Sequence, residues 1–294
     1  MERAAYTILS RDLGSRIRVP RRLGANVLLI DLTANGGGSD WAEAAARIVS
    51  PVKLKSERRG FVRGEHWQRY WQSLAKELHA AADEASADDK SKLLEWAAKA
   101  ERALAAAKTP CSSQPLWSGR RIDCGWLGDG YYATGLIDEG DAAALRVKPW
   151  GARVFTPAEY EFEEHVWGGP LLVLVDGDTA SAAEEFAAVL QDNKAAVVIG
   201  APTLGAGCGH TDGGTPTQLS HSGGILELPD CARLRADGAN EVAGTDPDVL
   251  IGFRSADGIR RKAKRLTLAL PRGVAAAVRL CRGERCAAAA GRVQ

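Results

Sequence analysis

The sequence of 294 residues lacks any long apolar segment. No run of about 18 or more apolar residues occurs, so no part of the chain is expected to span a membrane. Residues 1–22 are polar and basic and contain no apolar core of the kind that a secretion signal needs. The net charge is only +1, which gives no reason to expect nucleic acid or another polyanion as a partner.

Metal-binding spacings are also missing. The six cysteines and five histidines form no C-x-x-C or H-x-x-x-H pattern, which disfavours zinc, and we predict no metal or organic cofactor. The cysteines instead fall into three near-neighbour pairs: Cys111 with Cys124, Cys208 with Cys231, and Cys281 with Cys286. Such pairs favour small disulfide loops and an oxidising compartment, so a periplasmic or secreted location is expected.

Short apolar runs alternate with helical patterns along much of the sequence. Three runs have the length and composition of buried parallel strands: residues 25–34, 171–176 and 195–200. Shorter strands are expected near residues 215–220 and 225–228. Helices are predicted at residues 39–49, 181–192 and 260–268. The alternation predicts an α/β core.

The pattern changes between the first two apolar runs. Aromatic and aliphatic residues recur at helical spacing from about residue 59 to residue 108, which predicts a hairpin of two helices. A loop-rich stretch with little periodicity follows it. We therefore expect an insertion, able to act as a lid over a site, between two parts of a core and before a C-terminal tail. The expected boundaries are 1–51 and 167–270 for the core, 52–166 for the insertion and 271–294 for the tail.

The sharpest local feature is Ser181, which lies where an expected strand gives way to an expected helix. A serine at this junction can expose its hydroxyl beside free backbone N–H groups and the positive end of the helix dipole. An acyl-transfer nucleophile needs these conditions. The residues also fit an ordinary alternative, because Ser181-x-x-Glu184 is a capping box of the kind that many helices use.

Three ordered motifs together resemble one family. LLVLVDGDTASAAEEFAAVLQDNKAAVVIGAPTLGAG resembles the nucleophile region of the C-terminal processing serine peptidases. Its segment Ser-Ala-Ala-Glu-Glu-Phe resembles more closely the branch of the family that contains the tricorn core and the repeats of interphotoreceptor retinoid-binding protein. LLIDLTANGGG and ANEVAGTDPDVLI resemble the other two signatures, so the resemblance covers roughly residues 25–50 and 168–252. It implies a crotonase/ClpP-like β-α spiral core with a mainly helical insertion, and a serine peptidase acting on a peptide or protein substrate.

The resemblance also assigns roles to single residues. Ser181 matches the nucleophile, and the N–H of Ala182 matches one donor to the oxyanion. The other donor would come from the glycine turn, at Gly37 or Gly38, where a backbone close to a reacting carbonyl needs residues without Cβ. A plain strand-to-helix turn is the alternative, and a phosphate-binding loop is disfavoured because no Lys-Ser/Thr follows the glycines.

Two acidic residues match supporting positions of the family. Glu184 would orient a base or cap its helix, since it shares a helix face with Ser181. Glu241 precedes Asp-Pro-Asp and matches the glutamate that, in the tricorn branch, completes a charge network with the base. Without the resemblance, Glu241 would be read as a solvated loop carboxylate.

The general base departs from the family pattern. The Ser-Lys branch has its lysine where this sequence has Ala206, which cannot accept a proton. The tricorn branch takes a histidine from a strand upstream of the glycine turn, but the first histidine here is His66. Either the base is lost, or it lies in sequence that precedes residue 1, or it is local. His210, in a turn expected near Ser181, is the local candidate, and His221 is a weaker one.

Three alternatives remain open at this stage. A non-catalytic binding protein on the same fold is favoured by the missing base. A crotonase-like acyl-CoA enzyme is disfavoured by the serine at the helix start and by Asp246-Pro247-Asp248. A cysteine nucleophile would need a partner base, and Ser181 occupies the better position.

Overall fold

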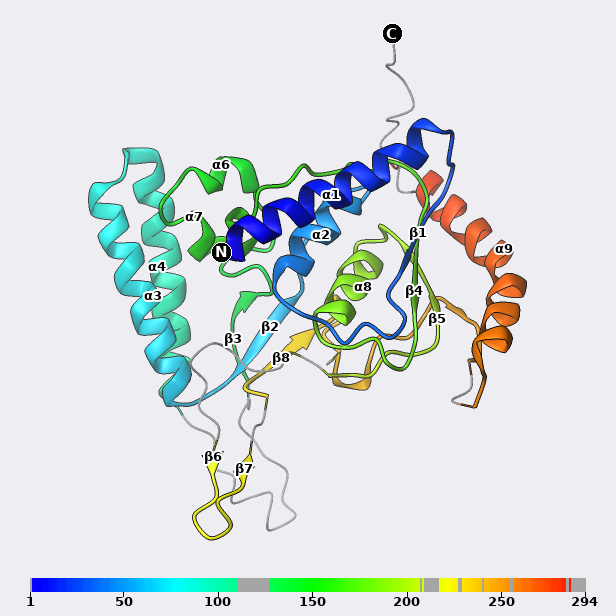
Figure 1. Cartoon of the computed structure of the whole chain (residues 1–294). Helices are drawn as coiled ribbons and strands as arrows, with labels where there is room; N and C mark the ends of the chain where they lie inside the picture. Colours follow the sequence, from blue (N-terminus) through cyan, green and yellow to red (C-terminus); the bar gives the residue numbers. More distant parts are fainter. Residues whose placement is uncertain are drawn as a thin grey trace.

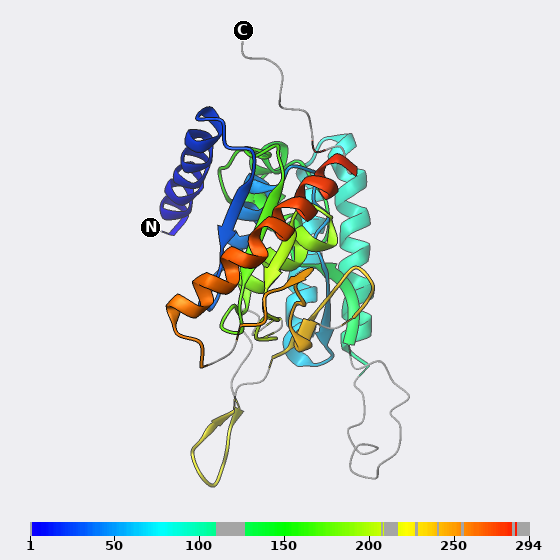
Figure 2. The same ribbon diagram turned by 90° about the vertical axis from the view of Figure 1, so that its right-hand side faces the viewer.

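A parallel sheet with helices on both faces forms the centre of the protein (Figures 1 and 2). The computed structural model describes residues 2–109, 127–206, 208, 217–226, 229–239, 241–253, 256–283 and 286. Within them, the sheet has the strand order β1-β4-β5-β9. Its strands are β1 (Leu28–Asp31), β4 (Leu171–Val175), β5 (Val197–Gly200) and β9 (Val249–Leu250). The predicted α/β core is confirmed.

Apolar side chains on both faces of β4 explain why its sequence shows no polar alternation. Leu171, Val173 and Val175 pack into a cluster with α2 (Trp41–Val49) and α8 (Ala182–Asp192). Leu172 and Leu174 pack on the other side, against α9 (Ile259–Gly283). All five residues of β4 are buried, as is typical of a strand covered on both faces.

Two long helices differ from the sequence-based expectation. The helix expected at residues 260–268 is only the first part of α9, which continues through Pro271 to Gly283. Gly273 lies against the sheet, where an added Cβ would be 3.1 Å from Ile199 Cγ2. The polar N-terminal segment, in which no helix was predicted, forms α1 (Glu2–Arg22), which packs on α2.

The residues between β1 and β4 contain the predicted helical hairpin, made by α3 (Glu65–Glu84) and α4 (Ala87–Ala107) (Figure 1). Short helices follow at α6 (Ala142–Arg146), α7 (Gly151–Val154) and η1 (Thr156–Glu159). The same region supplies β2 (Arg58–Val62) and β3 (Leu127–Tyr132), which were not expected. They form an antiparallel sheet of order β3-β2-β8 with β8 (Cys231–Leu234), so this region is tied to the segment after the parallel sheet's third strand. A hairpin of β6 (Thr217–Gln218) and β7 (Ile225–Leu226) and the turn η2 (Glu241–Ala243) complete the elements.

Two of the three predicted cysteine pairs are disulfide-bonded. Cys208 is bonded to Cys231, and Cys281 to Cys286, with Cα atoms 5.5 and 4.9 Å apart. The third predicted pair, Cys111 and Cys124, lies outside the described residues. In the described part of the chain, none of the helices combines the length and apolarity that crossing a membrane would require.

Candidate active site

The carboxyl ends of β1 and β4 are tied together by hydrogen bonds. The Thr179 hydroxyl donates to the carbonyl of Leu32 (2.9 Å) and accepts from the N–H of Asp176 (3.0 Å). The N–H of Ala180 donates to the carbonyl of Asn35 (2.9 Å). Because the two strands are parallel and adjacent, their following loops meet at one edge of the sheet, which is where open α/β sheets bind ligands.

Ser181 lies in a strained turn at this edge. Its backbone angles are φ 54° and ψ −123°, a conformation that costs a non-glycine residue about 1–3 kcal/mol. Its N–H donates to Glu184 Oε2 (2.8 Å), while the N–H of Glu184 donates back to the Ser181 carbonyl (2.9 Å). Ser181 therefore begins α8 in a sharp strand-to-helix turn, the kind of turn that presents a nucleophilic hydroxyl in α/β-hydrolases.

The glycine turn contacts Ser181 directly. Gly37 has φ +97°, and an added Cβ would lie 2.7 Å from Ser181 Cβ and 2.8 Å from the nitrogen of Ala182. Only glycine fits both the conformation and the space. The N–H of Gly37 already donates to Asn35 Oδ1 (2.9 Å), whereas the N–H groups of Gly38 and Ala182 have no acceptor among the described residues. Of the two glycines left open by the sequence, Gly38 has the available donor.

Glu184 connects the nucleophile turn to the next loop at the same sheet edge. Its side chain is fully buried. Oε2 accepts from the N–H groups of Ser181 (2.8 Å) and Ala206 (2.9 Å). Oε1 accepts from the Thr203 hydroxyl (2.5 Å) and from the N–H of Gly205 (2.6 Å). With four donors around it, this carboxylate holds two loops in register and has no oxygen left to orient a base.

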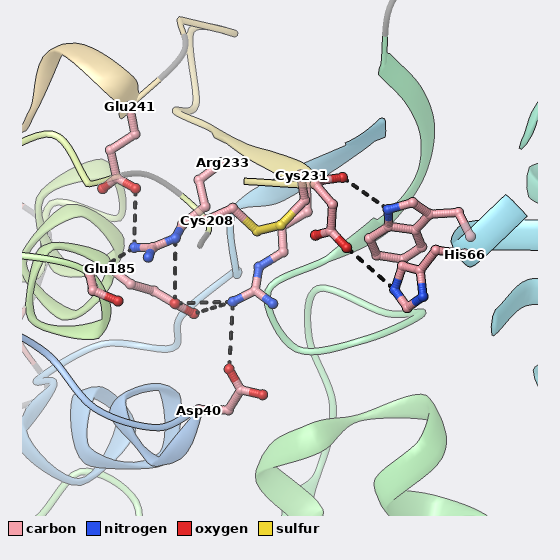
Figure 3. The surroundings of a disulfide bond; sticks show 11 residues. Asp40, His66, Glu185, Cys208, Cys231, Arg233 and Glu241 are labelled. Carbon is pink, nitrogen blue, oxygen red and sulfur yellow. Dashed lines mark hydrogen bonds and ion pairs between the residues drawn. A yellow bond between two sulfur atoms is a disulfide. The ribbon is translucent and has the colours of Figure 1, made fainter. Parts of the chain in front are cut away.

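Glu241 belongs to a chain of charged side chains that are largely buried, except for the half-exposed Asp40 at its end (Figure 3). Arg233 Nη1 lies 3.1 Å from Glu241 Oε2, and Arg233 Nε lies 3.7 Å from Glu185 Oε2. Arg59 Nη2 then reaches Glu185 Oε2 (3.1 Å) and Asp40 Oδ1 (3.7 Å). Glu241 is fully buried, so reading it as a solvated loop carboxylate is wrong.

The buried carboxyl groups of this network differ in their affinity for protons. Burial raises the pKa of Glu241 to about 7, with a contribution from the negative charges of Glu185 and Glu184 and against the attraction of Arg233. Burial also works against ionisation of Glu185, but Arg59 and Arg233 together hold the pKa of Glu185 below its ordinary value. Glu241 is thus the member of the network that changes charge near neutral pH.

The base remains unassigned in the described part of the chain. His210 lies outside the described residues. Three other histidines contact groups away from Ser181: His66 contacts Asp230, His79 contacts Glu101, and His165 contacts the carbonyl of Ser50. His221 is exposed on the loop of the β6–β7 hairpin. Cys208 is disulfide-bonded, which removes its thiol as a rival nucleophile.

A serine at a strained strand-to-helix turn, facing a glycine turn from a neighbouring parallel strand, is an arrangement of hydrolase type. The sequence profile of peptidase family S41 matches residues 10–251, and the chain belongs to this family. No curated protein sequence matches it significantly.

Solved structures of similar fold include mature CPAF and its complex with lactacystin. Mature CPAF in complex with lactacystin is 20% identical, with a TM-score of 0.55, over 94% of this chain and 47% of that one. Mature CPAF alone is also 20% identical, with a TM-score of 0.54 and the same coverage of 94% and 47%. The chain therefore spans less than half the length of these solved relatives.

Proposed function

We propose that this chain carries the nucleophile of a serine peptidase that hydrolyses peptide bonds in a peptide or protein substrate. The observation that carries the proposal is the strained turn of Ser181 against Gly37, with φ 54° at the serine and no room for a Cβ at the glycine. A backbone keeps such strain only where the surrounding structure enforces it, and such sites cluster where function requires them. Membership of family S41 supports the same reaction.

The reaction is acyl transfer in two steps. The Ser181 hydroxyl attacks the carbonyl carbon of the scissile peptide, and its proton passes to a base. The N–H groups of Ala182 and Gly38 stabilise the oxyanion, because they have no other acceptor among the described residues. The C–N bond then breaks, and the amine leaves with the proton. Water hydrolyses the ester and regenerates Ser181.

Two glutamates support this site in different ways. Glu184 holds the Ser181 turn against the loop of Gly205 through its four hydrogen bonds. Glu241 supplies a carboxyl group whose pKa, about 7, allows it to take part in proton movement at neutral pH. His210 stays our local candidate for the base.

The wider context of the site also belongs to this proposal. Residues 52–166 would be an insertion that covers the site, held to the core through the pairing of β2 with β8. The two disulfides support a periplasmic or secreted location, because such bonds persist in oxidising compartments.

A ligand-binding protein without catalysis is the second candidate. One observation favours it: among the described residues, no histidine contacts Ser181, and Glu184 is fully occupied. In that case the Ser181 turn would hold a ligand through the N–H groups of Ala182 and Gly38 without bond cleavage.

Hydrolysis of an unfolded protein such as reduced casein, followed by mass spectrometry, separates the two candidates. The peptidase predicts new peptides with the wild-type chain and none with Ser181→Ala, while Ser73→Ala, at an exposed position on α3, cleaves as the wild type does. Equal cleavage by wild type and Ser181→Ala would contradict the proposed nucleophile, and no cleavage by either would favour the binding protein.

A further inference from the structure

Arg233 is a buried cation in direct contact with the nucleophile residue. Its side chain is 2% exposed, and its Nη1 donates to the carbonyl oxygen of Ser181 (3.0 Å). The same guanidinium faces Glu241 (3.1 Å) and Glu185 (3.7 Å), so its charge is compensated where it is buried (Figure 3). Neither composition nor family resemblance pointed to this arginine.

The peptide bond after Ser181 makes this contact relevant to the reaction. In a planar trans peptide, the C=O of one residue and the N–H of the next lie in one plane and point in opposite directions. The Ser181 carbonyl, which accepts from Arg233 as well as from the N–H groups of Glu184 (2.9 Å) and Glu185 (3.1 Å), therefore shares its plane with the N–H of Ala182, the proposed oxyanion donor. Fixing the oxygen fixes the direction of that N–H, and a charged donor on the oxygen polarises the peptide, which strengthens the N–H as a donor.

β8 is well suited to hold Arg233 in place. It pairs with β2 over four residues, with Arg233 opposite Arg59. Cys231, two residues before Arg233, is bonded to Cys208. Cys208 follows the loop of Gly205 and Ala206, whose N–H groups bind Glu184. The strand that carries Arg233 is thus anchored to the same loop that holds the Ser181 turn.

We propose that Arg233 is a positioning residue of the active site, which orients the N–H of Ala182 toward the oxyanion by holding the Ser181 carbonyl. The inference rests on the proposed function. It adds to it a residue that never touches the substrate and acts through the backbone of the nucleophile.

Arg235 provides a matched control on the same segment. It is also largely buried and ion-paired, but its guanidinium binds Asp192 (2.6 Å) and Gln191 (2.7 Å) at the opposite end of α8 from Ser181. A substitution there removes a comparable buried pair without changing any contact of the Ser181 carbonyl.

The test measures how fast a fluorophosphonate probe labels the wild type, Arg233→Lys and Arg235→Lys, with the rate at saturation (kinact) separated from the apparent affinity (KI). Lysine keeps the charge but cannot span Ser181 and Glu241 with one planar group. Loss of one oxyanion donor costs about 100- to 1,000-fold, so a misdirected donor should lower kinact about 10- to 100-fold in Arg233→Lys. KI should change little, and Arg235→Lys should label as the wild type does.

A rescue experiment distinguishes positioning from a general structural role. Arg233→Ala leaves a buried gap of guanidinium shape, and added methylguanidinium should restore part of kinact there and none in Arg235→Ala. Equal kinact in folded Arg233→Lys and wild type would overturn the inference and leave the proposed function intact, and so would a fall of the same size in Arg235→Lys. A wild-type chain that is not labelled would instead contradict the proposed function, and the inference with it.

Discussion

Replacing Glu184 by glutamine, which exchanges one oxygen for an NH2 group, should damage both the stability and the reactivity of the site. The carboxylate accepts four hydrogen bonds, two on each oxygen, from Ser181, Thr203, Gly205 and Ala206. Glutamine keeps one acceptor oxygen and replaces the other by an NH2 group that only donates. If that group takes the place of Oε2, it faces two backbone N–H groups. If it takes the place of Oε1, it faces the N–H of Gly205, and the Thr203 hydroxyl must accept a hydrogen bond from the NH2 group instead of donating one.

The size of the effect follows from these contacts. In either orientation at least one bond to a charged acceptor is lost, at about 1.5–3 kcal/mol, and the remaining ones become neutral and therefore weaker. We expect Glu184→Gln to lower the free energy of unfolding by about 3–5 kcal/mol, a large share of the 5–15 kcal/mol typical of a domain.

Urea unfolding followed by tryptophan fluorescence measures this loss. Glu84→Gln, at an exposed position of α3, is the matched control and should stay within about 0.5 kcal/mol of the wild type. Among the folded molecules, the probe should label Ser181 more slowly in Glu184→Gln than in the wild type, whereas Glu84→Gln should be labelled at the wild-type rate. If Glu184→Gln proved as stable and as reactive as the wild type, Glu184 could not be the group that joins the two loops.

Three further predictions concern the same region. Gly37→Ala should slow labelling of Ser181 about 100-fold, because the added Cβ would lie 2.7 Å from Ser181 Cβ. The control Gly36→Ala, whose added Cβ has no atom within 4 Å, should be labelled at the wild-type rate. Equal labelling rates for the two variants would refute the close approach of Gly37 to Ser181. Since the pKa of Glu241 is raised from 4.5 to about 7, its contribution to stability is present below pH 4.5 and lost as the pH rises through about 7. In urea titrations the wild type should therefore lose stability relative to Glu241→Gln across that window, because glutamine does not titrate, and a constant difference would count against the raised pKa. Removal of the Cys208–Cys231 bond by double serine substitution should lower the free energy of unfolding by about 3 kcal/mol for a loop closed across 23 residues, and an unchanged melting curve would show that the bond does not stabilise the fold.

The sequence predicted those elements whose signal is local. β4 and β5 are continuous apolar runs because both faces of the sheet are covered, and the hairpin of α3 and α4 shows its buried aromatic and aliphatic residues at helical spacing. Ser181 and the glycine turn were recognisable because each follows shortly after the end of an apolar strand, a pattern that a few consecutive residues show.

What the sequence did not predict depends on contacts between distant residues. β2 and β8 carry the buried arginines Arg59 and Arg233, and an arginine in a strand looks like a surface residue until its partner is known. That partner, Glu185 for both, comes from a different element. The helix predicted at residues 260–268 stopped short of Pro271, since a proline usually ends a helix, but α9 continues past this proline to Gly283.

The central claim is that Ser181 is an activated nucleophile. The most direct measurement is the intact mass of the chain after incubation with a fluorophosphonate, followed by peptide mapping of the modified residue, for wild type and Ser181→Ala. An activated serine displaces fluoride from phosphorus orders of magnitude faster than an ordinary hydroxyl. We predict one adduct, located on Ser181 and missing in Ser181→Ala. An adduct on another residue, or the same adduct in both proteins, would contradict the account.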